Sequence, residues 1–156
     1  MTDQEEQEEQ ARRLKVSAGL LGAALRDIKS AETLVDTRDP DQAFTAAYLV
    51  QQAAEKIAKA LLANMGHLVT KEHRLAFNLP PLEADPQAPD LKHFTRYDAY
   101  ATTARYPYPN GDLFPSPNID ELDADIRSLR ALYTSTLTRL GLPDPPAAAR
   151  SGRSRP

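Results

Sequence analysis

The sequence contains no cysteine. This absence excludes disulfide bonds, thiolate metal ligands and a cysteine nucleophile, and it fits a cytoplasmic protein. No apolar stretch approaches the roughly 18 residues that a membrane-spanning helix needs. The longest candidate, Ser17–Leu25, ends at Arg26 and Asp27. The acidic N-terminus also lacks the basic residues that precede the apolar part of a secretory signal. We therefore expect a cytoplasmic protein with no membrane partner.

A strong basic excess, the usual mark of a nucleic-acid-coating protein, is also missing. The formal net charge is -3, and it is unevenly distributed. Residues 1–10 carry five acids and no bases, residues 150–156 carry three arginines and no acids, and the chain between them has 16 bases and 17 acids. Any contact with nucleic acid is therefore expected to be local.

Sequence signatures of metal and cofactor sites are absent as well. His67 and His73 are six residues apart, which does not place them on one turn of a helix, and His93 is isolated. No glycine-rich phosphate loop or serine-hydrolase motif occurs. The acids Asp120, Asp123 and Asp125 open a predicted helix, where they complement its dipole. We predict no cofactor and no metal.

The dominant pattern is the 3.6-residue apolar period of amphipathic helices. One stripe predicts a helix of about 25 residues from Leu14, and a second predicts a helix from Pro40 to Met65, with Asp39 as its N-cap. A third follows the N-cap Asn118 and stops at Gly141. The positions on the three stripes are Leu14, Ala18, Leu21, Leu25, Ile28, Ala31 and Val35; Phe44, Ala47, Gln51, Ala54, Ala58, Leu61 and Met65; and Ile119, Leu122, Ile126, Leu129, Tyr133, Thr136 and Leu140.

Two shorter helices are expected between the second and third stripes. One covers His73–Asn78, and the other runs from about Asp90 to Ala104. Proline-rich loops at residues 79–89 and 106–117 flank the second. No segment alternates with period two. The sequence thus predicts an all-α, up-and-down bundle of about five helices.

The domain occupies residues 11–141 in this prediction. Residues 1–10 are either an acidic tail or the start of the first helix. Residues 142–156, rich in Pro, Ala, Ser and Arg, are expected to be a disordered tail. Gly19, Gly22 and Ala23 form a small-residue face beside the first apolar stripe, which would let another helix approach closely, and we expect a homodimer.

Three motifs, in this order, resemble those of the HEPN domain family. They are Gln51-Gln52-Ala53-Ala54-Glu55-Lys56 with the rest of its helix, His73-Arg74-Leu75, and Ala104-Arg105-Tyr106-Pro107. The match runs from about Leu14 to Leu140. The resemblance implies a helical bundle, often a homodimer and often encoded beside a minimal nucleotidyltransferase, in some cases as a toxin–antitoxin pair of a prokaryote. It also implies nucleotide binding and, in one branch of the family, metal-independent RNA cleavage.

The sequence departs from the nuclease branch of the family. In that branch an arginine is followed by four to six residues and then by a histidine. The corresponding positions after Arg105 are Asn110, Gly111 and Asp112, and no arginine in the chain has a histidine at that spacing. Asparagine and glycine cannot move a proton near neutral pH as histidine does. Efficient catalysis is therefore not expected.

We hypothesise that Glu55, Lys59, Arg105 and Tyr106 line one ligand-binding cleft. Lysine and arginine would meet a phosphate, and tyrosine would present a flat face to a base. The bland alternative is a solvated Glu-Lys pair with an arginine that caps a helix. His73 is expected to be a partly buried structural histidine and is the one weak candidate for a catalytic base.

The function favoured is a nucleotide- or RNA-binding module that acts with a partner protein, such as a nucleotidyltransferase in a toxin–antitoxin or stress system. The alternatives are a metal-independent ribonuclease with an altered site, and a structural dimerisation domain.

Overall fold

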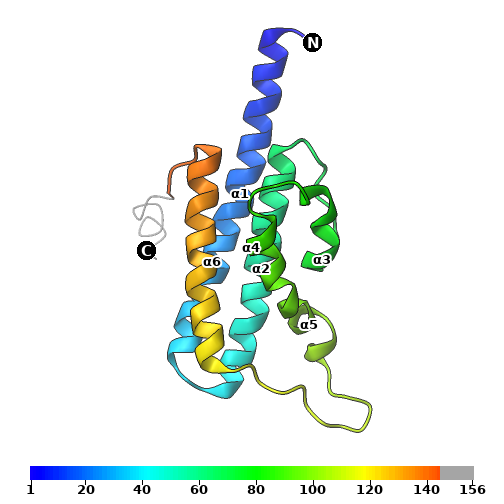
Figure 1. Cartoon of the computed structure of the whole chain (residues 1–156), viewed down its shortest axis with the longest axis vertical. Coiled ribbons are helices and arrows are strands. Elements are labelled where there is room, and N and C mark those ends of the chain that lie inside the picture. The colour runs from blue at the N-terminus through cyan, green and yellow to red at the C-terminus, as the bar shows by residue number, and fades with distance from the viewer. Residues whose placement is uncertain (145–156) are drawn as a thin grey trace, which may run out of the picture.

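Three long helices form an up-and-down bundle, and a chain of short helical segments lies against one side of it (Figure 1). The computed structural model describes residues 1–144, among which no strand occurs. The all-α bundle predicted from the sequence is confirmed. The elements are α1 (Asp3–Asp36), α2 (Pro40–Asn64), α3 (Leu75–Asn78), η1 (Pro80–Leu82), α4 (Ala88–His93), η2 (Phe94–Tyr97), α5 (Asp98–Ala101), η3 (Thr103–Arg105) and α6 (Ile119–Leu140).

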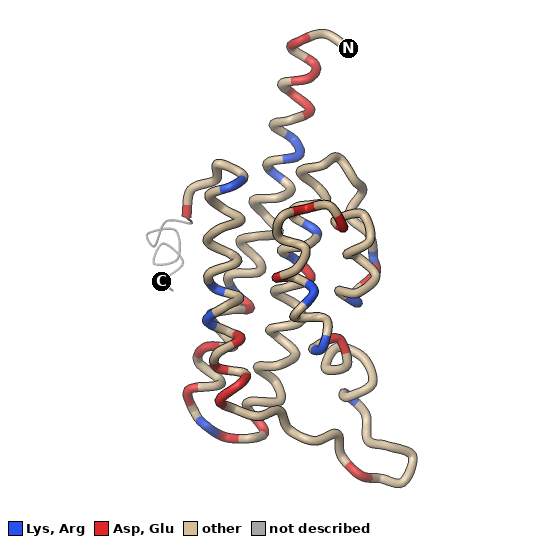
Figure 2. Tube along the Cα trace, in the orientation of Figure 1, with Lys and Arg blue, Asp and Glu red and all other residues tan. Residues whose placement is uncertain are grey.

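Helix α1 is longer than the sequence pattern predicted. Thr2 caps it: its hydroxyl accepts from the Glu5 backbone N–H at 3.2 Å, and the Glu5 carboxylate accepts from the Thr2 N–H at 2.7 Å. Residues 1–10 are therefore the start of a helix rather than a tail. The first turns of α1 project beyond the bundle and carry most of its acidic residues (Figures 1 and 2).

The core is built by the inner faces of the three long helices. On α1, Ser17 rather than Ala18 faces inward, and its hydroxyl donates to the Ala60 carbonyl at 2.8 Å. Gly141 ends α6 at a positive φ of 68°, as its C-cap position predicted. The largest fully buried apolar side chains in and around this core are Phe94, Leu21, Ile28, Ile57, Leu61, Leu75, Leu82, Leu91, Leu122, Ile126 and Leu129.

The prediction of one continuous helix from Asp90 to Ala104 is wrong. The segment is divided into four short elements, α4, η2, α5 and η3. Its apolar positions Leu91, Phe94 and Tyr97 are buried as expected, but Asp98 turns its carboxylate to the backbone N–H groups of α3. Thr102, with φ of -127° and ψ of -98°, leaves the helical conformation between α5 and η3. The apolar period runs through this break, so periodicity alone could not locate it.

The loop predicted at residues 79–89 contains η1. The predicted disordered tail covers residues 142–156, and its part from residue 145 on lies outside the described residues. Of the residues that are described, Leu142 packs against the core. None of the helices in residues 1–144 has the length and apolar character needed to cross a bilayer.

Candidate functional site

A buried ion pair lies on α2 under the loop that leads to α3. Lys59 Nζ donates to Glu55 Oε1 at 2.7 Å, and the two side chains are only 6% and 4% exposed. They are one helical turn apart, which brings their side chains to one face. The bland expectation of a solvated pair is therefore wrong. Burial of two charges is costly and is tolerated when each has a partner.

The partner of this pair from outside α2 is His73. Its Nδ1 lies 3.2 Å from Glu55 Oε1, while the histidine side chain is 71% exposed. The sequence prediction of a partly buried histidine is thus corrected. In the tautomer that donates from Nδ1 to the carboxylate, Nε2 is the ring nitrogen left without this contact.

The backbone around His73 is anchored by two further side chains. Gln51 Nε2 donates to the His73 carbonyl at 2.6 Å and to Asp98 Oδ1 at 2.9 Å. Asp98 in turn accepts from the N–H groups of Leu75 at 2.8 Å and Ala76 at 3.0 Å. A loop histidine is therefore held in one place by buried groups, an arrangement that pre-orients a functional side chain.

Arg105 and Tyr106 line a second feature, a cavity of about 430 Å³ at the end of η3. The Arg105 guanidinium lies over the ring of Tyr48, 5.2 Å from its centroid, and makes no hydrogen bond within residues 1–144. Tyr106 is 75% exposed. The cavity is also lined by Asp41, Phe44, Ala104, Pro107, Leu113, Phe114, Pro115 and Ser116.

The four predicted site residues therefore form two pairs. Glu55 and Lys59 do not line the cavity of Arg105 and Tyr106. Tyr48, which carries the guanidinium, is seven residues from Glu55, about 10 Å along the axis of α2. What joins the pairs is one face of α2, with Arg105 near its middle and His73 closer to its C-terminal end.

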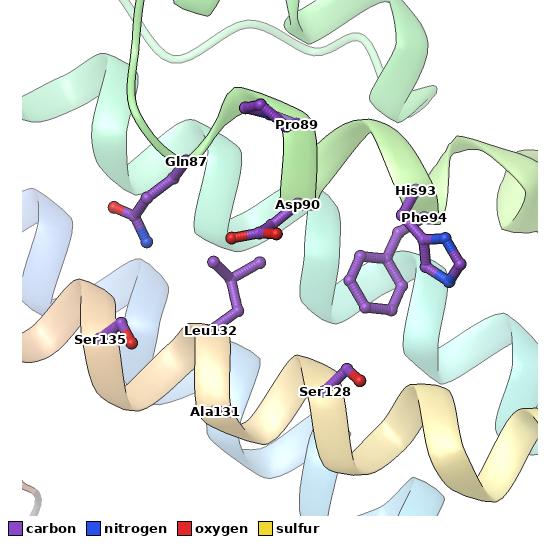
Figure 3. A pocket seen from close by; sticks show the side chains of 9 residues that line it. All are labelled: Gln87, Pro89, Asp90, His93, Phe94, Ser128, Ala131, Leu132 and Ser135. Atoms are coloured by element: carbon purple, nitrogen blue, oxygen red, sulfur yellow. The ribbon is translucent and has the colours of Figure 1, made fainter.

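A third feature, between α4 and α6, was missed from the sequence. The cavity has a volume of about 520 Å³. Figure 3 shows Asp90 and Phe94 pointing from the α4 side toward α6. The other lining residues are Gln87, Pro89, His93, Ser128, Ala131, Leu132 and Ser135. No lysine or arginine lines it, so it is poorly suited to a phosphate.

His93 at the edge of this cavity is not isolated, as its sequence position suggested. Its Nε2 lies 2.9 Å from Asp125 Oδ1, and Asp125 also accepts from Arg96 and from the Tyr97 hydroxyl. The groups come from segments about 30 residues apart, so no sequence spacing could have revealed them. Within residues 1–144, no three His, Asp or Glu side chains are grouped as a metal site.

The family model that matches the chain is the HEPN domain, over residues 18–126. This is well over half of the 156 residues. The chain belongs to the HEPN domain family. The matched region of this HEPN protein contains α2 and His73 as well as Arg105 and its cavity. Neither a curated protein nor a solved structure matches the chain. Membership of the family supports a module related to nucleotides or RNA.

Proposed function

We propose that this HEPN protein binds a nucleotide or RNA through Arg105 and Tyr106. The observation that carries the proposal is a permanently charged guanidinium that makes no hydrogen bond within residues 1–144, at the mouth of an aromatic-lined cavity. A guanidinium offers a planar pair of donors to a phosphate. The exposed ring of Tyr106 offers a stacking surface for a base.

The proline that follows each of the two tyrosines supports this role. Pro107 and Pro109 restrict the backbone around Tyr106 and Tyr108, which reduces the entropy lost when a ligand orders them. The ring of Tyr108 also packs at 6.0 Å from that of Phe114, which lines the cavity. The tyrosines are thus presented with limited freedom.

Glu55 and Lys59 act indirectly in this proposal. Lys59 is paired with Glu55 and only 6% exposed. Its charge is therefore balanced by the carboxylate, and Lys59 does not contact the phosphate directly in this proposal. The role that fits the pair is to hold His73 on the same face of α2, where it meets the ligand beyond the Arg105 cavity.

The test is a titration of labelled short RNAs and nucleotides against wild type and Arg105→Ala. We expect the variant to bind at least about tenfold more weakly, which corresponds to one charge-assisted hydrogen bond of about 1.5 kcal/mol. Arg127→Ala is the matched control, because Arg127 is an exposed arginine on α6. Equal affinities of wild type and Arg105→Ala would refute the site.

The position of His73 favours a second candidate, metal-independent RNA cleavage. A histidine oriented by a carboxylate can act as a general base through its free nitrogen. We expect binding without efficient cleavage, because positions 110–112 after Arg105 hold no histidine. Incubation of the same RNAs with purified protein in EDTA tests this expectation. Robust cleavage that disappears in His73→Ala would promote the nuclease.

The proposal includes protein partners. A minimal nucleotidyltransferase in a toxin–antitoxin or stress system is one, and co-purification at a fixed ratio with such a protein encoded by an adjacent gene is the expected result. A second copy of the chain is the other. Small residues on the outer face of α1 support self-association, since Gly19 is exposed.

A further inference from the structure

The outer face of α1 is open along its middle. Ser17, Leu21 and Ile28 face the core, and Gly19 lies on the opposite side of the helix. A Cβ added at Gly19 or at Gly22 would meet nothing within 4 Å. Each glycine costs a helix interior about 1 kcal/mol relative to alanine. Nothing within the described part of the chain makes use of their small size.

The first part of α1 has no neighbour within residues 1–144. A Cβ at Gly66 would lie 2.8 Å from the Arg13 guanidinium, so the loop after α2 meets α1 at about residue 13. Residues 3–12 continue past this level, a length of about 15 Å (Figure 1). These ten residues, the overhang, are held helical by propagation from the rest of α1 and by the Thr2 cap. Their surface is therefore open to a second molecule.

Charge is segregated along the same helix. The overhang carries Asp3, Glu5, Glu6, Glu8 and Glu9 with Arg12 as its one base, whereas the other bases of α1 follow it (Figure 2). Glu9 is shared between two neighbouring arginines of its own helix.

Two bases further along α1 remain available to a partner. Arg26 and Lys29 make no salt bridge among residues 1–144. Arg26 lies on the same outer face as Gly19, seven residues or two helical turns away. One helix therefore presents an acidic end and a basic middle on one open face.

We propose that α1 pairs with α1 of a second copy in antiparallel orientation, about a two-fold axis between Val16 and Gly19. This inference rests on the proposed self-association and specifies its surface. In this register Glu9 lies opposite Arg26 of the second copy, and Glu5 lies near its Lys29. Glu8 is adjacent to the Glu9–Arg26 contact and lies opposite Asp27, whose charge is already paired with Lys56 of its own chain. A parallel arrangement would instead place acids opposite acids.

The small residues fit the same register. Gly19 lies opposite Val16, which is 47% exposed, at the closest approach of the helices. Arg12 lies opposite Ala23, where a small side chain leaves room for the guanidinium. The pairing covers residues 5–30, about 39 Å of helix. The overhang of each copy then rests on the bundle of the other.

The experiment is a charge reversal read by sedimentation. Variant one is Glu8→Arg with Glu9→Arg, and variant two is Arg26→Glu with Lys29→Glu. Wild type is expected to sediment at twice the 17.2 kDa chain mass. Each variant alone should dimerise at least about tenfold more weakly, because like charges then face each other at both ends of the interface. An equal mixture should recover the wild-type affinity, since both contacts are again complementary in the heterodimer.

A steric arm tests the close approach separately. Gly19→Gln is expected to preserve the helix and weaken the dimer, with Ala124→Gln on the exposed face of α6 as the matched control. Circular dichroism establishes that each variant is folded. A wild type that stays monomeric at about 100 μM would overturn both the self-association and the register. A wild-type dimer that ignores the charge and Gly19 variants would overturn the register alone.

Discussion

The three long helices and the segment at residues 65–118 are held in place by different forces. Between α1, α2 and α6 the core is apolar, with Leu21, Ile57 and Leu129 fully buried. Ion pairs such as Lys56–Asp27 lie at the less buried edges of these helices. The segment buries fewer large apolar side chains and depends on polar anchors, chiefly Asp98 and Asp125. The first region therefore supplies most of the stability, because burial of apolar area is the dominant favourable term.

The difference explains where the candidate site residues occur. His73 and Arg105 both belong to the second region, and each is exposed while its neighbours are tied to α2. Hydrogen bonds are directional and orient a side chain more closely than apolar packing does. A rigid bundle that displays oriented polar groups is a suitable scaffold for a binding site.

The largest effect is expected from a cavity in the bundle. Leu129→Ala removes a side chain of α6 that is completely buried, so unfolding should become easier by about 3–4 kcal/mol. Chemical denaturation followed by circular dichroism measures it. Leu113→Ala is the control, because that leucine is 80% exposed in the second region. Similar losses in the two variants would erase the distinction between the regions.

A smaller effect is expected from the ion pair that supports His73. Lys59→Met leaves the Glu55 carboxylate buried with only His73 and the Gln52 amide beside it, which should cost about 2–3 kcal/mol. The double variant with Glu55→Gln should recover at least about half of this loss, because no unpaired charge then remains. If the double variant were as unstable as the sum of the single ones, the pair would not be coupled.

The buried tyrosines predict a loss of stability at high pH. Burial raises the pKa of Tyr133, and burial likewise raises the pKa of Tyr97. The folded chain thus holds these protons at a pH where the unfolded chain releases them. Stability is fully present below pH of about 10, the unfolded value, and falls as the pH rises through the raised values.

Tyr133→Phe sharpens this prediction, because the Tyr133 hydroxyl is buried and has no hydrogen-bond partner within residues 1–144. The variant should change stability at pH 7 by less than about 1 kcal/mol and reduce the loss between pH 8 and 11. Urea unfolding across that range is the measurement. An unchanged alkaline loss would show that Tyr133 does not contribute to it.

The smallest effect is expected at the C-terminus. Deletion of residues 145–156 should leave the melting temperature nearly unchanged, because that stretch has no periodic apolar positions. Leu142→Ala, which removes a side chain packed on the core, should lower it by a few degrees, equivalent to about 1 kcal/mol. Calorimetry of the two variants compares them directly, and a larger drop for the deletion would reverse the prediction.

The sequence by itself determined the three long helices and most of their ends. Apolar period, the N-caps Asp39 and Asn118 and the C-cap Gly141 are local signals, and the structure uses all of them. Family membership was also readable, because the motifs around Glu55, His73 and Arg105 follow the chain in order. Residues 1–10 were left open only because their helix carries no apolar stripe.

Tertiary structure alone decided the rest. It broke the predicted helix after His93 and buried the Glu55–Lys59 pair. It also left His73 exposed beside that pair and placed the pair outside the Arg105 cavity. Each of these outcomes depends on contacts between residues far apart in sequence, such as Gln51 with Asp98. The free energy of a buried charge depends on the partners that the fold brings to it, and the spacing of residues along one helix does not contain that information.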